Sequence, residues 1–544
     1  MFTNISQFGM GSSLSDAGEY VTYDNMGNIL VYGFFASEMD FDPTGASTNV
    51  SPLGKPDLFV AKYAPAGNLI WVFNLGRISL NNGMEAGGIA VDSNNDILIT
   101  GSYTNAVNFN PLGAPLTKSS AGGKDAFLAK YSSEGELIWI NTYGSNLFDY
   151  GSSLALDADD NIYLGIGFYG NIDVGENGSP VILSPQSGGS DAALVKYDPN
   201  GAYFWNYHIS SVGNDKITAI EIAADGKVAL GATVNGETSG VAKKDMKMFL
   251  LNANGTLHWE YNFNNFEHAN AISSFLFSED NSALYVAGRI QGQTEFDPSG
   301  SESTLIQPLF ADPFFAKYNI SDGSLLFAKH IESAGIEDYV SGITTAGSAL
   351  ILVGSFDFQA IFVPGDFSTQ INSQGDMDIY MAAYDKMTGE FIQAKTFGGA
   401  GTEFARHAHF NPNGNVAVTG SFSGSLDIHP QDNPISAAGL SDIFFAEFSF
   451  QLNVNDGLKP KLSGEEIVLF PVPANDFIGV RFLTAPLKPV QVKIMNIVGS
   501  TVAEFNYENY SANRRIDITE LNSGIYIMEI STDGNRVSKR FVKN

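Results

Sequence analysis

The chain has 544 residues, no cysteine, and 59 Asp and Glu against 29 Lys and Arg, which gives a formal net charge of −30. The lack of cysteine excludes a disulfide scaffold, a cysteine-ligated zinc site and a cysteine nucleophile. The acidic charge argues against nucleic acid as a partner. No apolar run is long enough to cross a bilayer, so we expect no transmembrane segment.

An alternating apolar segment that ends in Gly recurs along the first part of the chain. At spacings of 57 to 68 residues, its copies end at Gly33, Gly101, Gly167, Gly231, Gly288, Gly354 and Gly420. A second segment, such as DLFVAKYAPAGNLIW, follows each copy and begins at Asp57, Asp125, Asp191, Asp245, Asp312, Asp378 or Asp442. Alternation interrupted by turn residues predicts two strands in each segment, so every unit offers four strands.

Seven units of four strands predict an all-β fold, a seven-bladed β-propeller over residues 1–450, with a β-solenoid as the alternative. The last unit, Asp442–Phe450, lacks a fourth strand, and the chain start MFTNISQFG is similar to fourth strands such as WVFNLG. We therefore expect Phe2 to Ile5 to complete the seventh blade, which would remove the open strand edges of the ring.

The repeat units resemble a known family. The segments IAVDSNNDILITG, EFDP (residues 295–298) and DAFLAKY followed by GELIW are similar to SBBP-type β-propeller repeats of bacterial surface proteins. The resemblance extends over about 450 residues. It implies the propeller fold and no particular activity, because a fold does not determine a function.

Short acidic motifs follow several of the landmark glycines: DFDP at Asp40, NFNP at Asn108, NIDV at Asn171, EFDP at Glu295 and DIHP at Asp427. Carboxylate and amide oxygens suit calcium, which makes Asp40, Asp42 and Asp297 candidate calcium ligands. The alternative is a structural turn that opens a long loop. The Asp-rich segments at residues 92–96 and 157–161 have the same two interpretations, tight turn or calcium site.

Aromatic and histidine side chains offer further candidates. The four tryptophans, Trp71, Trp139, Trp205 and Trp259, share one repeat position. This pattern favours packing between blades over an array that stacks on sugars. His407 and His409 share one face of a predicted innermost strand, where blade two has Gly88 and Ala90. A packed pair is favoured there over a two-histidine metal site.

Loop lengths predict where a ligand would bind. The landmark Gly and the landmark Asp are 24 residues apart in five units and 22 in the seventh, but only 14 in the fourth, from Gly231 to Asp245. We expect this short connection to leave a notch in the long-loop face, with positive charge from Lys243 and Lys244. Loops on a rigid scaffold often carry binding sites, so these two lysines are candidate binding residues.

The charge asymmetry marks a domain boundary. Residues 465–544 carry nine Lys and Arg and nine Asp and Glu, so the whole negative excess lies before them. The polar segment 451–464, QLNVNDGLKPKLSG, is predicted to be a linker. Alternating segments after it predict a small immunoglobulin-like β-sandwich over residues 465–544.

The order of motifs in this last domain closely resembles the type A C-terminal sorting domain of the type IX secretion system. The matching residues are Pro471, Pro473, Asn475, Asn496, Gly499, Gly524, Tyr526, Lys539 and Arg540. The resemblance implies the type IX machinery as a partner and a secreted or outer-surface location. The family also needs an N-terminal export signal, which we expect to be absent from this chain, either trimmed or lost to a misassigned start. An immunoglobulin-like adhesion module is the alternative.

Together these features predict an exported propeller that binds a glycan, a peptide or another envelope protein. No hydrolase elbow, phosphate loop or zincin helix is present. The alternatives are a hydrolase or lyase that acts on polysaccharide inside the channel, and a structural component of the surface. No cofactor other than calcium is suggested.

Overall fold

The structure, a computed structural model, contains two compact units, Met1–Gln451 and Leu452–Asn544. It describes residues 2–54, 56–76, 83–175, 179–186, 188–238, 241–263, 270–297, 305–308, 310–411, 414–428, 434–450, 467–470, 474, 477–482, 490–496, 500–507, 513–532 and 535–544.

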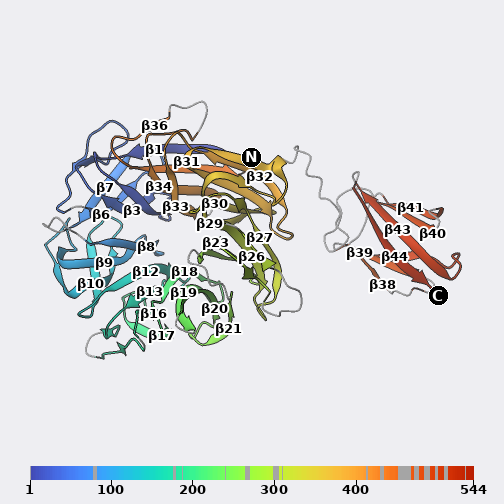
Figure 1. Cartoon of the computed structure of the whole chain (residues 1–544), viewed down its shortest axis with the longest axis horizontal. Helices are drawn as coiled ribbons and strands as arrows, with labels where there is room; N and C mark the ends of the chain where they lie inside the picture. The colour runs from blue at the N-terminus through green and yellow to red at the C-terminus, as the bar shows by residue number, and fades with distance from the viewer. Residues whose placement is uncertain are drawn as a thin grey trace. The chain divides into compact units, whose positions relative to one another are not determined.

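The described part of the first unit forms seven antiparallel sheets arranged as the blades of a ring (Figure 1). The seven-bladed β-propeller is therefore confirmed. From the innermost strand outward, blade 1 consists of β2 (Ala17–Tyr23), β3 (Ile29–Phe35), β6 (Asp57–Tyr63) and β7 (Leu69–Leu75). Blade 2 consists of β8 (Glu85–Val91), β9 (Ile97–Asn108), β10 (Thr117–Tyr131) and β11 (Leu137–Tyr143). Blade 3 consists of β12 (Asp149–Leu156), β13 (Ile162–Phe168), β16 (Asp191–Tyr197) and β17 (Tyr203–Ile209).

Blades 4 to 6 follow the same plan. Blade 4 consists of β18 (Lys216–Ile222), β19 (Val228–Thr238), β20 (Val241–Leu251) and β21 (Leu257–Asn262). Blade 5 consists of β22 (Ala271–Phe277), β23 (Ala283–Ile290), β26 (Asp312–Asn319) and β27 (Leu325–His330). Blade 6 consists of β29 (Tyr339–Ala346), β30 (Ala349–Ile361), β31 (Gln370–Asp385) and β32 (Phe391–Phe397). In blade 6 the short β28 (Glu332–Ser333) also pairs with β30.

Blade 7 joins the two ends of the propeller. It consists of β33 (Glu403–Phe410), β34 (Asn415–Phe422), β37 (Asp442–Phe450) and, as its outermost strand, β1 (Phe2–Met10). The pairing of β1 with β37 runs from Phe2 opposite Phe450 to Met10 opposite Ile443, so the N-terminal strand continues beyond Ile5. Phe8 is buried and stacks on Phe445 with ring centres 4.9 Å apart.

The sequence pattern follows from each strand's place in its blade. In β6, DLFVAKY, every residue is buried, because neighbouring blades cover both faces of the sheet. In β7, LIWVFNL, exposed and half-buried side chains are interspersed with buried Phe73 and Leu75, since this strand forms the outer edge. The core therefore lies in the wedges between blades rather than at one centre.

The tryptophans pack between blades, which confirms the packing interpretation. Trp71 of blade 1 donates its indole N–H to the carbonyl of Ser133 in blade 2 at 3.1 Å. Trp205 of blade 3 lies against Gly255 of blade 4, where an added Cβ would approach the indole to 2.7 Å. Gly255 also has φ +82°, so glycine is required there by both backbone conformation and space.

An Asp-rich turn joins the first two strands of a blade. In three blades its Asp forms an ion pair with a lysine of the third strand, which gives the turn a structural role. Asp92 accepts backbone N–H groups from Asn94 at 2.8 Å and Asp96 at 2.9 Å, and its carboxylate lies 2.7 Å from Lys130 Nζ of the third strand. Equivalent pairs join Lys62 to Asp24 and Lys196 to Asp157, each at 3.0 Å.

The long connections of most blades fold back into the wedges between blades, where they bury apolar side chains. Four include small sheets: β4 (Met39–Asp40) with β5 (Asn49–Val50), β14 (Ile172–Asp173) with β15 (Ile182–Leu183), β24 (Thr294–Glu295) with β25 (Leu305–Ile306), and β35 (Ser425–Leu426) with β36 (Ile435–Ser436). The connection in blade 1 buries Phe41, whose carbonyl accepts the hydroxyl of Tyr63 at 3.1 Å. In blade 2, Phe109 and Tyr131 repeat the contact at 2.9 Å.

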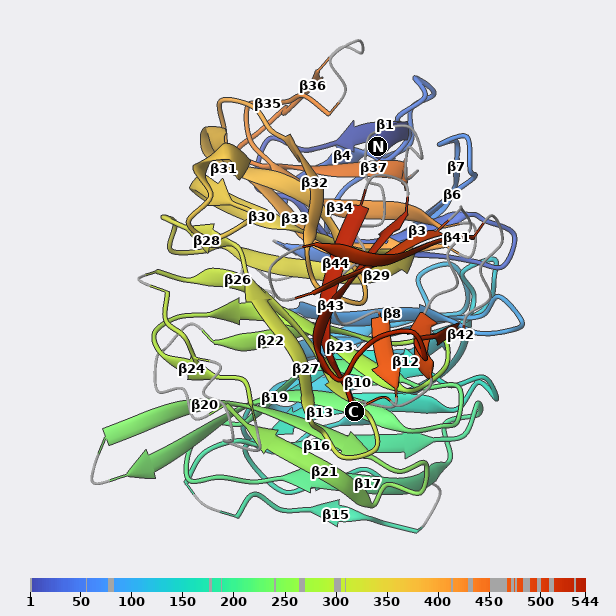
Figure 2. The same cartoon turned by 90° about the vertical axis from the view of Figure 1, so that its right-hand side faces the viewer.

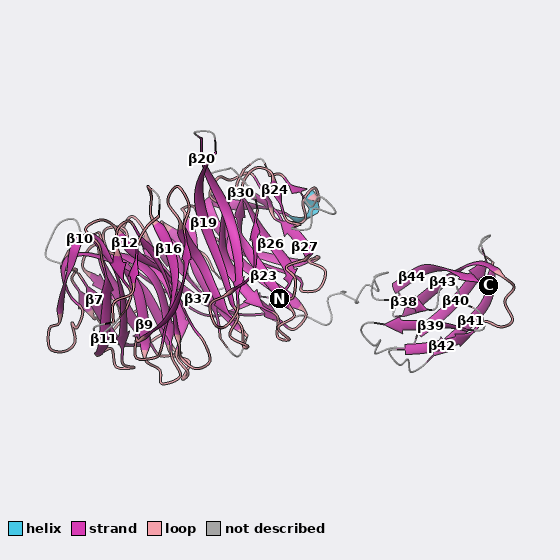
Figure 3. Cartoon of the chain, turned by 90° about the horizontal axis from the view of Figure 1, so that it is seen from below, coloured by secondary structure: helices cyan, strands magenta, loops and turns pink. Residues whose placement is uncertain are grey.

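The prediction of a notch at blade 4 is wrong. Strands β19 and β20 continue in one unbroken register as far as Thr238 opposite Val241, without the shift that interrupts the pairing of β9 with β10. They form a ribbon that extends beyond the neighbouring strands (Figures 2 and 3). The shorter sequence between Gly231 and Asp245 thus makes a straight hairpin, because it contains no segment that could fold back.

The second unit contains two sheets, as the predicted small β-sandwich requires. The first sheet has the strand order β38 (Ile467–Phe470), β39 (Phe477–Phe482), β42 (Asn513–Asp517). The second sheet has the strand order β41 (Thr501–Tyr507), β40 (Val490–Asn496), β43 (Gly524–Thr532), β44 (Asn535–Lys543). Ile478, Ile494 and Met528 are part of the core between them. Across the described ranges of the whole chain the helical structure is the 3-10 turn η1 (Phe367–Thr369), and no helix there could span a membrane.

Candidate functional site

The candidate site is a cavity of about 960 Å³ at the centre of the ring. It is lined by side chains of all seven innermost strands, β2, β8, β12, β18, β22, β29 and β33. Residues 24–27 and Asn411, which follow the innermost strands of blades 1 and 7, also reach it. The cavity is therefore the channel of the propeller, with its lining continuing to the turns on one face.

Each innermost strand begins with the same irregularity. The pairing of first and second strands shifts register near the start of the first strand in all seven blades, for example between Gly18 and Tyr20 and between Ala405 and His407. Such bulges re-aim side chains and are common beside functional sites. The bulged position carries a hydroxyl in four blades, at Ser152, Thr218, Ser273 and Ser341.

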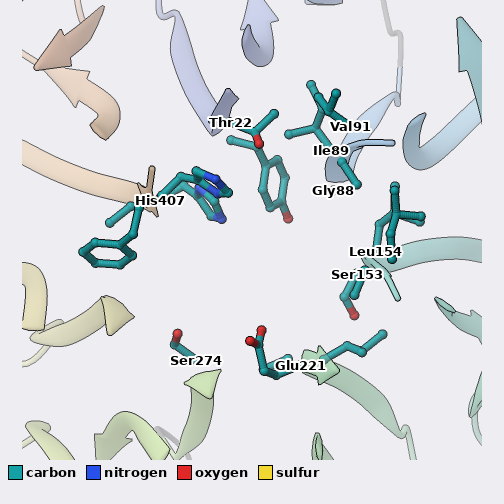
Figure 4. A pocket seen from close by; sticks show the side chains of 18 of the residues that line it. Thr22, Gly88, Ile89, Val91, Ser153, Leu154, Glu221, Ser274 and His407 are labelled. Carbon is teal, nitrogen blue, oxygen red and sulfur yellow. The ribbon is translucent and has the colours of Figure 1, made fainter. Parts of the chain in front are cut away.

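After the bulge, residues two apart occupy equivalent positions in the innermost strands and form two rings of seven, of which all but Gly342 line the cavity. The first ring consists of Tyr20, Gly88, Ser153, Ala219, Ser274, Gly342 and His407. The second consists of Thr22, Ala90, Ala155, Glu221, Leu276, Thr344 and His409. Figure 4 shows His407 and Glu221 at the same cavity, on different strands.

The structure places His407 and His409 in the channel, where both imidazoles are uncharged at neutral pH. Burial lowers the pKa of His407 to about 3, and the neighbouring His409 contributes to this shift. Burial lowers the pKa of His409 to about 4. His407 Nδ1 accepts the backbone N–H of Val21 at 3.4 Å, which assigns the ring proton to Nε2.

Glu221 is the acidic group of the second ring, and sequence reasoning missed it. Burial raises the pKa of its carboxyl to about 8, so the group is largely protonated at neutral pH. No hydrogen bond or ion pair to Glu221 occurs within the described part of the chain. The one signal in the sequence is its position in the repeat, where three other blades have the apolar residues Ala90, Ala155 and Leu276.

The resulting lumen combines polar groups with apolar side chains such as Ile89, Leu154 and Phe275, and Asp24, whose carboxylate pairs with Lys62 at 3.0 Å, also lines it. Its polar groups include hydroxyl groups, one carboxylic acid, two neutral imidazoles and the ring of Tyr20, which lies 5.3 Å from His407. This composition contrasts with the chain's net charge of −30. Hydroxyl, carboxyl and imidazole groups both donate and accept hydrogen bonds, so the site suits an uncharged polar ligand.

Two of the calcium candidates serve as loop caps. Asp40 Oδ1 accepts backbone N–H groups from Asp42 at 3.0 Å and Thr48 at 2.8 Å. Burial raises the pKa of Asp40, but these hydrogen bonds and one from Ser47 hold it below its ordinary value. Asp42 accepts the backbone N–H of Thr44 at 2.9 Å. Asp297 is half-buried and donates its N–H to Glu295 at 3.0 Å.

The structure brings few of the other predicted ligands together. Within the described ranges no three His, Asp or Glu side chains are placed to hold one metal ion, so His407 and His409 gain no third ligand there. Lys243 and Lys244 lie on β20, opposite Gly236 and Asn235, and their side chains fall outside the described residues. The predicted linker, 451–464, falls outside them too.

Several residues of the sorting motif have visible structural roles. Asn496 Oδ1 accepts the backbone N–H of Ser500 at 3.0 Å and closes a turn. Tyr526, close to Gly524 in β43, donates its hydroxyl to the carbonyl of Asn522 at 2.8 Å and stacks on Phe541. Lys539 and Arg540 lie on β44. The remaining residues of the motif, Pro471, Pro473, Asn475 and Gly499, are outside the described ranges.

Comparison with known proteins gives relatives for parts of the chain. A mimivirus protein described as an uncharacterized WD repeat-containing protein is 22% identical over 192 residues, which cover 31% of this chain and 14% of that protein. The regulatory protein FlaEY of Caulobacter vibrioides is 25% identical over 188 residues, 34% of this chain and 19% of its own length. The chain thus spans less than a fifth of these curated relatives.

Among solved structures, the Neurospora crassa Pan2 WD40 domain is similar at a TM-score of 0.37 and 8% identity, over 82% of this chain and 98% of that one. A europium-containing methanol dehydrogenase is similar at a TM-score of 0.39 and 10% identity, over 82% and 93%.

Residues 468–544 match the family described as the secretion system C-terminal sorting domain. The matched range begins within β38 and ends with the last residue after β44, so it spans both sheets of the second unit. The chain is therefore an exported β-propeller protein, secreted or held at the outer cell surface, which carries a C-terminal sorting domain for the type IX secretion machinery.

Proposed function

We propose that the protein is a binding protein whose channel takes an uncharged, polyhydroxylated ligand, a neutral glycan segment. The observation that supports this most directly is the lumen itself, where hydroxyl groups, the uncharged imidazole of His407 and the largely protonated carboxyl of Glu221 line one cavity of a strongly acidic protein. We also infer that the repeats are of the SBBP type, as the sevenfold recurrence of their motifs suggests. The ligand would be captured outside the cell, where the sorting domain delivers the protein.

The test measures binding of neutral oligosaccharides by calorimetry, with sulfated and uronate-rich oligosaccharides beside them. Replacement of Ser274 by Trp fills the lumen and is expected to abolish binding of the neutral sugars. Leu326→Trp is the matched control, because Leu326 lies in the same blade and is 54% exposed on β27. Binding that survives Ser274→Trp, or that the control abolishes equally, would remove the channel from the proposal.

The pH dependence of binding gives an independent prediction. Because the pKa of Glu221 is about 8, its ionisation above pH 8 places a charge in the lumen, and the affinity for a neutral sugar is expected to fall there. Glu221→Gln keeps a hydrogen-bond donor and cannot ionise, so its affinity should stay constant from pH 6 to pH 9. Parallel pH profiles for both proteins would contradict this role of Glu221.

A glycan-cleaving activity is the second candidate, and it rests on the same residue. A carboxyl group whose pKa is near 8 can act as a general acid at neutral pH. A hydrolase or lyase would shorten the bound oligosaccharide during incubation, which chromatography detects. Release of shorter products by the wild type but not by Glu221→Gln would favour the enzyme over the binding protein.

A further inference from the structure

An exposed phenylalanine in blade 6 has a left-handed backbone conformation. Phe358 lies four residues after the landmark Gly354, at the register shift in the pairing of β30 with β31. Its φ is +56°, and its side chain is 66% exposed. In this conformation the β-carbon crowds the following carbonyl oxygen, so the position is unfavourable for a bulky residue.

Other blades have residues at this position that accept the left-handed conformation easily. With φ between +58° and +71°, the equivalent residues are Asn105 in blade 2, Gly292 in blade 5 and Gly424 in blade 7. Each of them lies four residues after the landmark glycine of its blade. The fold of these blades therefore uses the left-handed backbone and does not require an aromatic side chain there.

The ring of Phe358 adds little to the core. Among the described residues it takes part in no aromatic pair and in no hydrophobic cluster, whereas Phe356 two residues earlier is buried in the core of blade 6. The backbone beside the ring is nevertheless fixed, because Asp357 donates its N–H to the carboxylate of Asp338 at 2.5 Å and Gln359 pairs with Asn372. Strain of this kind, on a rigid support, clusters at functional sites.

A second exposed apolar side chain belongs to the loop that enters blade 6, residues 334–338. Ile336 is 68% exposed. The preceding residue, Gly335, lies against β30, because an added Cβ there would be 2.6 Å from the Cβ of Asp357. The residues that follow this contact on the two segments are Ile336 and Phe358, which together form what we call the blade 6 patch.

Acidic side chains accompany the blade 6 patch. Glu337 and Asp376 are exposed, and Asp357 is half-buried. Burial raises the pKa of Asp357, and the negative charges of Asp376 and Glu337 add to this shift, so the three carboxylates lie within electrostatic range of one another. No basic side chain is among the groups that shift this pKa. The local field is therefore negative and attracts cations.

We propose that the blade 6 patch is a docking surface for a polypeptide segment that presents a Lys or Arg side chain beside an apolar one. The apolar side chain would cover Phe358 and Ile336, and the cation would face the surrounding carboxylates or lie over the aromatic ring. The net charge of −30 would speed the approach of such a partner. The patch is separate from the lining of the channel, so the proposal does not depend on glycan binding.

The test uses the full chain and three labelled synthetic decapeptides, which combine Leu with Lys, with Ser or with Glu. Fluorescence polarisation at physiological ionic strength measures their affinities. The peptide of Leu and Lys is expected to bind most tightly, and Phe358→Asn should weaken its binding by about fivefold or more. The same substitution should raise the midpoint of thermal unfolding by about 1–2 °C, because asparagine adopts the left-handed conformation more easily.

Phe367→Asn is the matched control, because Phe367 lies in the same blade, is 70% exposed and is not among the residues with positive φ. It should change neither the affinity nor the midpoint. Ile336→Ser should weaken binding and leave the midpoint unchanged.

Three results would overturn the proposal. One is a Phe358→Asn protein whose midpoint does not rise, since the ring would then stabilise the fold. Another is an affinity that Phe358→Asn leaves unchanged or that Phe367→Asn lowers equally. The last is equal binding of the Leu and Ser or the Leu and Glu peptide, because the carboxylates would then contribute nothing.

Discussion

Phe8→Ala is expected to destabilise the propeller by about 3–5 kcal/mol, the usual range for removing a buried phenylalanine. Phe8 lies on β1, the strand that closes blade 7, and its ring contacts Phe445 of β37 and Tyr63 of blade 1, with ring centres 4.9 and 5.0 Å apart. The substitution would open a cavity at the one junction where the two ends of the propeller meet. Such a loss is a large part of the stability of a folded protein, typically about 5–15 kcal/mol.

Denaturant unfolding of the wild type and variant measures this difference. Ile5→Ala is the matched control, because Ile5 lies on the same strand and is 49% exposed, so its replacement should change the free energy by less than about 0.5 kcal/mol. Equal effects of the two substitutions would show that β1 contributes by backbone pairing alone.

Lys130→Met is the second substitution with a large expected effect, again about 3–5 kcal/mol. Lys130 Nζ lies 2.7 Å from Asp92 and 3.3 Å from Asp96, and the side chains of Lys130 and Asp92 are almost completely buried. The variant would leave the carboxylate of Asp92 in the interior without its cation. Thermal unfolding should therefore begin at a clearly lower temperature.

Two further variants separate the charge from the packing. Adding Asp92→Asn to Lys130→Met removes the unpaired charge and should recover part of the lost stability. Lys124→Met breaks the more exposed pair of Lys124 with Glu85 and should have an effect of at most about 1 kcal/mol. If the double variant is no more stable than Lys130→Met, the ion pair is not the source of the effect.

The repeats made the blades predictable, because each blade repeats one local pattern. Residues such as Gly101 and Trp71 recur at equivalent positions of their blades, Gly101 within the second strand and Trp71 within the fourth. The closing strand was predictable for the same reason, since β1 resembles β7 and β11 in sequence. Its full extent was not predicted, because Ser6 to Met10 continue the pairing past a bulge between Asn4 and Ser6.

The path of the long connections and the chemistry of the channel could not be predicted in this way. Phe41 and Phe109 enter a wedge that two different blades create, and their motifs resemble ordinary turns in sequence. Glu221 and His407 line the same cavity only because the ring closes, with three junctions between blade 4 and blade 7 along the chain.

The composite seventh blade also affects how the protein behaves when many copies fold together. The backbone hydrogen bonds between β1 and β37 can form in the same way whether the two strands belong to one polypeptide or to two. The β1 strand of another copy therefore fits an unclosed ring as well as the chain's own strand does, and reciprocal exchange would give domain-swapped dimers. Dilution favours the closed monomer, whereas crowding during refolding favours exchange, so protein concentration decides which product forms.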